Sequence, residues 1–415
     1  MEALPVPATA SMPKLADDVL LEILALVADD DEAALFRCAT TCHRWRRLIA
    51  DPTFLRRCWP ASALVGFFTH HSVEQYDPGN HRCTCTVVHG FIPALRSPRS
   101  PVTRILGSFV PAADALLEQG TPLASRGGLI LLRALDRSYC SAATLRLSVC
   151  NPLAGGTRDL LPPLEGFRVL YYALLLAGAD FRSSKLGLYY KVILIGFSSG
   201  DIKKYTILTF SSGDPSWSAP KSYLVSPLDR CGLWALQGQG AAVVTQGTAH
   251  WLLRDASSFY IQRVSATTGE YSLSKLSISS SQLPLGSYKY DEPRLSVASD
   301  GTLVLVCMHK YDFHVVTWTR REDGEIVDGT EEWIPTRQIK LTKPQHMYML
   351  RCLCTVERGS TLLIADGFID ERLYSANLDT AQVDQITDDN HPRYTSVEPF
   401  EVDWPTFFMS RIGVQ

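Results

Sequence analysis

Apolar and polar residues alternate with two different periods along this chain. Over residues 13 to 59, apolar residues recur every three or four positions, the spacing that places side chains on one face of a helix. The first such series is Leu20, Ile23, Leu24 and Val27. Beyond Trp59 the chain changes to short runs rich in β-branched and aromatic residues, separated by turn sequences such as "SSGD" and "ASDG". The pattern predicts a small all-α module followed by a large all-β domain.

The helical part divides into three expected helices. An aspartate can cap each of the first two, and Thr40 or Thr41 can cap the third, which should stop before the Asp51-Pro52 pair. The apolar residues expected on the second and third helices are Leu35, Cys38, Trp45, Leu48 and Ile49. Three short helices build only a marginal core, so such a module usually needs a partner.

The β-rich part shows many strand-like runs and no long amphipathic helix, which argues against alternating β/α architecture. The expected strands include 64–68, 127–134, 144–151, 189–197, 204–210, 241–254, 259–265, 294–308, 313–319, 360–367 and 372–378. About 350 residues of four-stranded units would form six to eight propeller blades, which leaves few exposed strand edges. No tryptophan is followed by aspartate and Gly-Gly pairs are rare, so the repeat signatures of WD and kelch propellers are missing. The expected divisions are a disordered tail over 1–12, a helical module over 13–59 and a β domain over 62–412.

Composition narrows the function classes. The chain has 415 residues, 46% of them hydrophobic and 20% charged, with a formal net charge of -3, so it has no general attraction for polyanions. Its eleven cysteines are scattered, which favours reduced thiols in the cytoplasm or nucleus. The N-terminal residues do not resemble a secretory signal, and the longest apolar run, from Val169, is about half of a membrane span. We expect an intracellular protein without a membrane partner.

The stretch "RCATTCHRWRRLIADPTFLRR" (37–57) admits three interpretations: a metal site, a nucleic-acid contact or a protein-docking face. Between residues 13 and 60 seven basic residues are balanced by eight acidic ones, so the positive field that phosphate binding needs is absent. Cys38, Cys42 and His43 cannot place three ligands tetrahedrally on one helix face. An apolar face around Trp45 remains, and tryptophan commonly anchors protein contacts.

Other candidate sites are weaker. The segment "GFSSG" (196–200) fits the nucleophile elbow of serine hydrolases, but a strand-like segment follows where the elbow requires a helix, so a hairpin turn is favoured over chemistry at Ser198. In "HRCTCTVVH" (81–89), Cys83 and Cys85 are spaced as in a strand rather than a zinc knuckle. Cys352 and Cys354 are interpreted as core residues. We expect no metal, no cofactor and no catalytic residues.

The order of residues in "LADDVLLEILALV" and "AALFRCATTCHRWRRLIADPTFLRR" resembles an F-box, the helical module that recruits its host to SCF-type cullin-RING ubiquitin ligases. The likeness departs at Ala16, where the family commonly has proline. The β-rich part is similar to the F-box-associated β-propeller-like domains of large plant F-box families, on segments such as "LSVCNPLAGGTRDLLPPL" (147–164).

The resemblance implies a division of labour. The helical module would bind a Skp-type adaptor and, through it, a cullin and a RING protein, while the β domain would select an unknown protein for ubiquitination and degradation. Catalysis would then belong to the RING-bound conjugating enzyme, and no nucleic acid would be involved. The residues expected at the adaptor interface are Leu15, Leu20, Ile23, Leu24, Leu35, Cys42, Trp45, Leu48, Ile49 and Pro52.

Two alternatives of other classes stay open. In one, the propeller senses a small molecule or glycan, and the F-box couples its occupancy to degradation. In the other, which the sequence favours less, the chain is a serine hydrolase that uses Ser198.

Overall fold

The computed structural model divides into two compact units, one of helices and one of strands. It describes residues 15–30, 32–58, 63–77, 82–94, 117, 120–134, 144–152, 157–176, 189–198, 201–224, 234–235, 240–255, 258–278, 289–298, 300–321, 329–345, 347–356, 360–366, 372–386 and 396–403. The helical unit comprises Met1–Ala61 and Trp404–Gln415, and the β domain spans Ser62–Asp403. The predicted tail over 1–12 and the predicted end at 412 lie outside the described residues.

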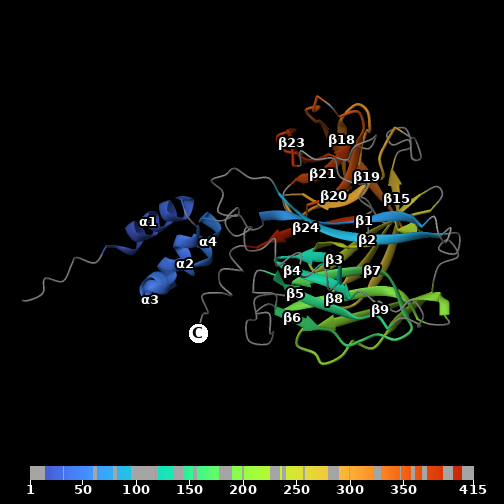
Figure 1. The fold of residues 1–415 in the computed structure, drawn as a ribbon, viewed down its shortest axis with the longest axis horizontal. Helices are drawn as coiled ribbons and strands as arrows, with labels where there is room; N and C mark the ends of the chain where they lie inside the picture. The colour runs from blue at the N-terminus through green and yellow to red at the C-terminus, as the bar shows by residue number, and fades with distance from the viewer. Residues whose placement is uncertain are drawn as a thin grey trace, which may run out of the picture. The chain divides into compact units, whose positions relative to one another are not determined.

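The described residues of the helical unit form four helices rather than the three predicted (Figure 1). They are α1 (Asp17–Asp30), α2 (Glu32–Thr41), α3 (His43–Ile49) and α4 (Pro52–Cys58). The Asp51-Pro52 pair ends α3 as expected but also begins α4. The Asp51 carboxylate accepts hydrogen bonds from the backbone N–H groups of Thr53 and Phe54, at 2.8 and 3.2 Å, and proline is well suited to a first helical position.

The β domain is built from sheets of antiparallel strands that follow one another along the chain. One sheet holds β3 (Gly120–Arg126), β4 (Leu129–Ala134), β5 (Leu147–Asn151) and β6 (Thr157–Leu160), and the next holds β7 (Phe167–Leu176), β8 (Tyr190–Ser198), β9 (Asp201–Ser211) and β10 (Lys221–Leu224). Another holds β20 (Leu350–Thr355), β21 (Thr361–Asp366), β22 (Leu373–Asn377) and β23 (Val383–Gln385). In each sheet consecutive strands pair in order, as in a propeller blade.

Two further four-stranded units have merged into one sheet. The first comprises β12 (Val243–Thr245), β13 (Thr248–Arg254), β14 (Phe259–Ser265) and β15 (Tyr271–Ile278), with the short β11 (Trp234–Ala235) beside β13. The second comprises β16 (Arg294–Val297), β17 (Leu303–Met308), β18 (His314–Arg320) and β19 (Thr330–Lys340). The outer strands β15 and β19 pair in parallel, while the inner strands β12 and β16 contact each other. The merged sheet therefore forms a nearly closed barrel.

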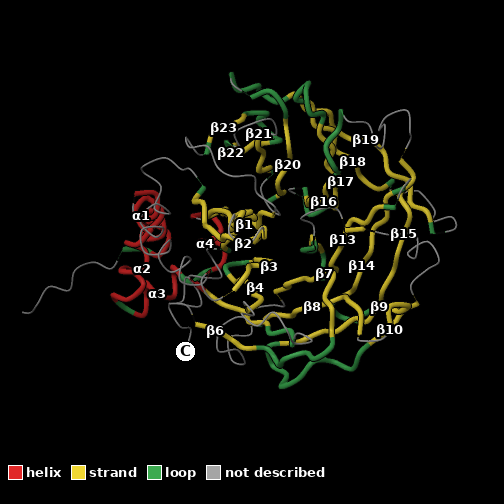
Figure 2. Tube along the Cα trace, turned by 45° about the vertical axis from the view of Figure 1, so that its right-hand side comes forward, coloured by secondary structure: helices red, strands yellow, loops and turns green. Residues whose placement is uncertain are grey.

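The ring of sheets closes with strands from both ends of the β domain. The strand β24 (Ser396–Val402) pairs with β1 (Ala63–Asp77), which forms a long hairpin with β2 (Arg82–Pro93). Figure 2 shows this sheet and the other described sheets arranged around a central axis, with β3, β7, β13, β16 and β20 nearest to it. The β domain is thus propeller-like, as predicted.

Apolar side chains fill the spaces between neighbouring sheets. One cluster joins the β3–β6 sheet to the β7–β10 sheet, and others follow around the ring. A separate cluster fills the interior of the nearly closed barrel, where Trp318 and Trp333 are 1% and 2% exposed. The strands predicted from β-branched and aromatic runs supply most of these buried residues.

Candidate functional site

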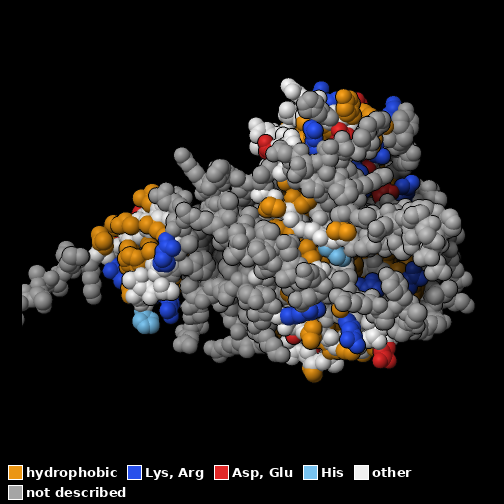
Figure 3. Space-filling view, in the orientation of Figure 1, with side chains coloured by type: hydrophobic (Ala, Val, Ile, Leu, Met, Phe, Trp, Pro, Cys, Tyr) orange, Lys and Arg blue, Asp and Glu red, His pale blue; other side chains and the backbone are white. Residues whose placement is uncertain are grey.

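An apolar stripe runs along one face of α1. Its members are Val19, Ile23 and Leu26 of α1, which are 44%, 42% and 68% exposed, together with Leu15 just before the helix, which is 53% exposed. With 3.6 residues per turn, the three positions within the helix lie within an arc of roughly 60°. Figure 3 shows hydrophobic side chains gathered on the helical unit, in contrast to its basic edge. Water contact at four neighbouring large apolar side chains is unfavourable, so this α1 stripe is suited to bind another protein.

The opposite face of α1 holds the helix in place. Leu20 and Leu24 are 4% and 1% exposed and belong to the core of the helical unit. Leu35 of α2 and Ile49 of α3 are fully buried in the same unit. Burial of such side chains stabilises the unit by about 1.5–3 kcal/mol each. The core of the helical unit therefore holds α1 in place, and the α1 stripe lies on the opposite, exposed face of this helix.

Ion pairs also orient α1 against the later helices. The Arg44 guanidinium donates to Asp17 Oδ1 from Nε and Nη2, at 2.8 and 2.6 Å, and also to the carbonyl oxygen of Leu15. Arg57 forms a two-pronged pair with the Glu22 carboxylate, with both distances 2.5 Å. The hydrogen bond from Arg57 lowers the pKa of Glu22. Because these ion pairs are largely exposed, they add little to the stability of the unit, and their main effect is to orient α1 relative to α3 and α4.

These contacts explain part of the arginine-rich stretch. Arg44, Arg47 and Arg57 all bind acidic residues of α1, which confirms the expected balance of charge. Among the described residues no group of three or more histidine, cysteine or acidic side chains could hold a metal ion. Cys42 is exposed at the break between α2 and α3, where its extended backbone precedes the first residue of α3.

The residues predicted for the adaptor interface differ in how deeply they are buried. Leu15, Ile23 and Cys42 are exposed, and Trp45 and Leu48 are half-buried. The four buried members are Leu20, Leu24, Leu35 and Ile49, and the side chain of Pro52 lies outside what the structure describes. The sequence prediction omitted Val19 and Leu26, although both lie at helical spacing from Leu15 and Ile23 and could have been found by that signal.

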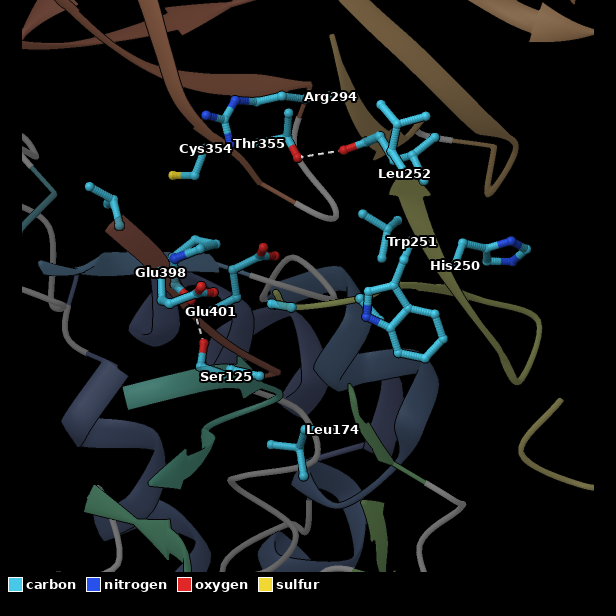
Figure 4. Close-up of a pocket in the computed structure, with 17 residues that line it drawn as sticks. Ser125, Leu174, His250, Trp251, Leu252, Arg294, Cys354, Thr355, Glu398 and Glu401 are labelled. Carbon is cyan, nitrogen blue, oxygen red and sulfur yellow. Dashed lines mark hydrogen bonds between the residues drawn. The ribbon is translucent and has the colours of Figure 1, made fainter. Parts of the chain in front are cut away.

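The β domain has a small cavity on its central axis (Figure 4). Inner strands supply its lining, including Ser125 of β3, Arg294 of β16, Cys354 of β20, and Glu398 and Glu401 of β24. The cavity volume is about 80 Å³, far below the several hundred Å³ of a typical ligand site. Its walls are tied together, because Ser125 donates to the carbonyl oxygen of Pro399 and Thr355 to that of Leu295. The axis is thus a narrow, partly polar junction between sheets.

Two buried cysteines of β20 are poor nucleophiles, and one of them, Cys354, lines this cavity. Burial raises the pKa of the Cys354 thiol well above its usual range, which keeps it protonated and weakly nucleophilic. Cys352 has a pKa raised to about 12 by the same cause. Both cysteines are buried, as the core interpretation predicted.

Ser198 does not form a nucleophile elbow. It ends β8 and pairs with Asp201 at the start of β9, so a strand follows where a helix would be required. Its hydroxyl lies 3.2 Å from that of Thr206. Gly196 of the same motif has a structural explanation, since a Cβ there would lie 2.1 Å from the carbonyl oxygen of Arg168.

The remaining cysteine motif lies in β2. Cys83 and Cys85 are strand residues, as expected, but their side chains and His81 are outside the described residues. The described helices include none long and apolar enough to cross a membrane.

Several solved structures resemble this chain remotely. A Dyadobacter fermentans protein of unknown function is 12% identical, with 81% of this chain and 90% of that chain covered and a TM-score of 0.34. Citrobacter koseri AztD is 8% identical, with 68% and 62% covered and a TM-score of 0.28. The Dos1 propeller is 10% identical, with 67% and 59% covered and a TM-score of 0.30. Scores this low support no argument about function.

Comparison by sequence gives a family match in the helical unit. No curated protein matches the chain. The F-box-like family model matches residues 15–58, which include the α1 stripe and all four helices. Residues 15–58 therefore form an F-box-like domain, and a β-rich domain follows it.

Proposed function

We propose that this chain is the substrate-recognition subunit of an SCF-type cullin-RING ubiquitin ligase. Its F-box-like domain binds a Skp-type adaptor, which connects it to a cullin and a RING protein. Its propeller-like domain binds a target protein for ubiquitination and degradation. The chain itself is not an enzyme in this proposal, because the bond-forming steps belong to the recruited conjugating enzyme. We also propose that it acts in the cytoplasm or nucleus.

The observation that carries the proposal is the α1 stripe on an F-box-like domain. A domain of four short helices that leaves Leu15, Val19, Ile23 and Leu26 in water has apolar area to bury against a partner. The half-buried Trp45 and Leu48 of α3 add apolar area on the same small domain. An interface of this kind takes most of its binding free energy from a few such anchors.

Co-purification of the full chain with a Skp-type adaptor tests this proposal. We expect the unaltered chain to retain the adaptor and the double variant Ile23→Asp, Leu26→Asp to lose it. Both positions are exposed, so the charges should leave the helical fold intact while opposing burial at an interface.

The control is Leu160→Asp, which places one such charge at a leucine of β6 that is 71% exposed. This variant should retain the adaptor as the unaltered chain does. Adaptor binding that survives the double substitution, or that survives deletion of residues 13–59, would exclude the proposed role of the F-box-like domain.

A further inference from the structure

A hollow opens at one mouth of the nearly closed barrel in the β domain. Its volume is about 510 Å³, within the range of ligand sites. The residues that matter for its chemistry are Thr245, His250, Arg263, Thr302, Arg320 and Trp333. It is distinct from the axial cavity, with which it shares only the strand residue His250 among the lining residues. Figure 4 shows the His250 ring directed away from Glu398, Glu401 and the indole of Trp251.

Two tight turns fix the rim of this barrel mouth. The β12–β13 turn has positive φ at Gln246 and Gly247, and the β16–β17 turn has positive φ at Gly301. The Thr245 hydroxyl donates to the carbonyl oxygen of Gly301 at 2.8 Å and ties one turn to the other. A rim that is already ordered loses little entropy when a ligand binds.

Buried polar groups at the barrel mouth are left without partners. His250 is 7% exposed, and neither of its ring nitrogens has a hydrogen-bond partner among the described residues. Trp333 is 2% exposed, and its Nε1 likewise has no partner among them. A buried polar group without a hydrogen-bond partner is unfavourable, so a molecule that pairs with these groups is favoured at this place.

The charges at the barrel mouth leave one cation uncompensated. Arg263 is held by Glu331 at 2.7 Å and donates to the Ser274 hydroxyl at 3.0 Å. Burial opposes ionisation of Glu331, but the hydrogen bond from Arg263 and the nearby Arg320 lower its pKa overall. The Arg320 side chain is exposed and forms no hydrogen bond or ion pair with any described side chain. Two guanidinium groups thus face one carboxylate.

From this arrangement we propose that the barrel mouth binds an oxyanion, either a carboxylate or a phosphate group. Arg320 would supply the charge, and the Trp333 indole N–H, a His250 ring nitrogen and threonine hydroxyls would supply hydrogen bonds. If the chain is a ligase subunit, the bound oxyanion would be an acidic or phosphorylated side chain of its target protein. Only this identification of the anion's source rests on the proposed function.

Thermal unfolding of the full chain with added anions tests the proposal. The probes are inorganic phosphate and glutarate, each compared with chloride at equal ionic strength. A rise in unfolding temperature with phosphate alone assigns the site to phosphorylated groups, with glutarate alone to carboxylates, and with both to either source. No rise with either anion would overturn the proposal.

Substitution of Arg320 tests whether the anion binds at the barrel mouth. Arg320→Gln should weaken the apparent affinity for the active anion by about tenfold or more, since a charge-assisted hydrogen bond is lost. The matched control is Arg321→Gln, which removes an adjacent exposed arginine that pairs with Glu332 at 2.7 Å and does not line the hollow. Equal weakening in both variants, or none in Arg320→Gln, would contradict the site.

A spectroscopic signal gives an independent readout. With nitrogen-15 in the tryptophans, the indole signal assigned through a Trp333→Phe variant should shift when the anion is added, because Nε1 gains a partner. An unmoved signal under a saturating anion concentration would contradict the proposed contact. These measurements need no adaptor, so failure of the proposed ligase role would leave their outcome unchanged and separately interpretable.

Discussion

His250 makes the stability of the β domain depend on pH. Burial lowers the pKa of this ring to about 4, with a further contribution from Arg263 that Glu331 partly offsets. In the unfolded chain the ring has its ordinary pKa near 6.5. Between pH 6.5 and 4 the unfolded state therefore binds more protons than the folded state, and the free energy of unfolding falls as the pH falls. The loss from this group is about 3 kcal/mol at pH 4.

Denaturant unfolding at pH 7 and at pH 4.5 checks this prediction. The unaltered chain and His250→Gln share the titration of every carboxylate, so the difference between them isolates the ring. The variant should lose clearly less stability on acidification than the unaltered chain. Parallel losses in the two proteins would show that His250 is already protonated or already solvated in the folded state.

At the scale of elements, the fourth helix shows how one capping residue, Asp51, sets where a helix begins. In α4 the Asp51 carboxylate accepts two backbone hydrogen bonds, and these bonds lower its pKa. Asp51→Ala should remove them and cost about 1 kcal/mol in local stability, whereas Asp51→Asn keeps an acceptor and should cost less. Amide hydrogen exchange over residues 53–58 of the full chain should accelerate roughly fivefold in the alanine variant only. Equal exchange in both variants would mean that the packing of Phe54 and Leu55, not the cap, holds the helix.

The same helix shows what the sequence could and could not predict. The residues Asp51-Pro52 were interpreted as a stop, although aspartate before proline also suits a helix start. Apolar runs predicted strands such as β8 and β17 correctly, because their side chains are buried on both faces. β19 was missed, since its sequence "TEEWIPTRQIK" is largely polar and its parallel pairing with β15 arises only in the folded domain.

The candidate sites were also hard to predict, because they depend on contacts that form only in the folded protein. α1 carries apolar residues on two faces, and periodicity alone does not tell which face the other helices cover. The structure buries Leu20 and Leu24 and leaves Val19 and Leu26 exposed. The barrel mouth draws on residues from β13, β14, β18 and β19, so no local motif could have predicted it.

At the scale of the whole β domain, the closing sheet joins the two ends of the ring. The strand β24 contributes Val397, Phe400 and Val402, all at most 4% exposed, to the sheet started by β1. The ring of Phe400 packs edge-on against Phe68, with centroids 5.6 Å apart. Burial of three such side chains stabilises the domain by roughly 5 kcal/mol or more, which is comparable to the total stability of many domains.

Two truncated chains test whether this closure is required. A chain that ends at residue 395 lacks β24 and should fail to unfold cooperatively, because it loses that burial and leaves the hydrogen-bonding edge of β1 open to other chains. A chain that ends at residue 403 keeps β24, so its β domain should unfold at the temperature of the full-length protein. Size-exclusion chromatography should show association only for the shorter chain. If both truncated chains unfold alike, the ring does not depend on its last strand, and each sheet is stable through its sequential neighbours alone.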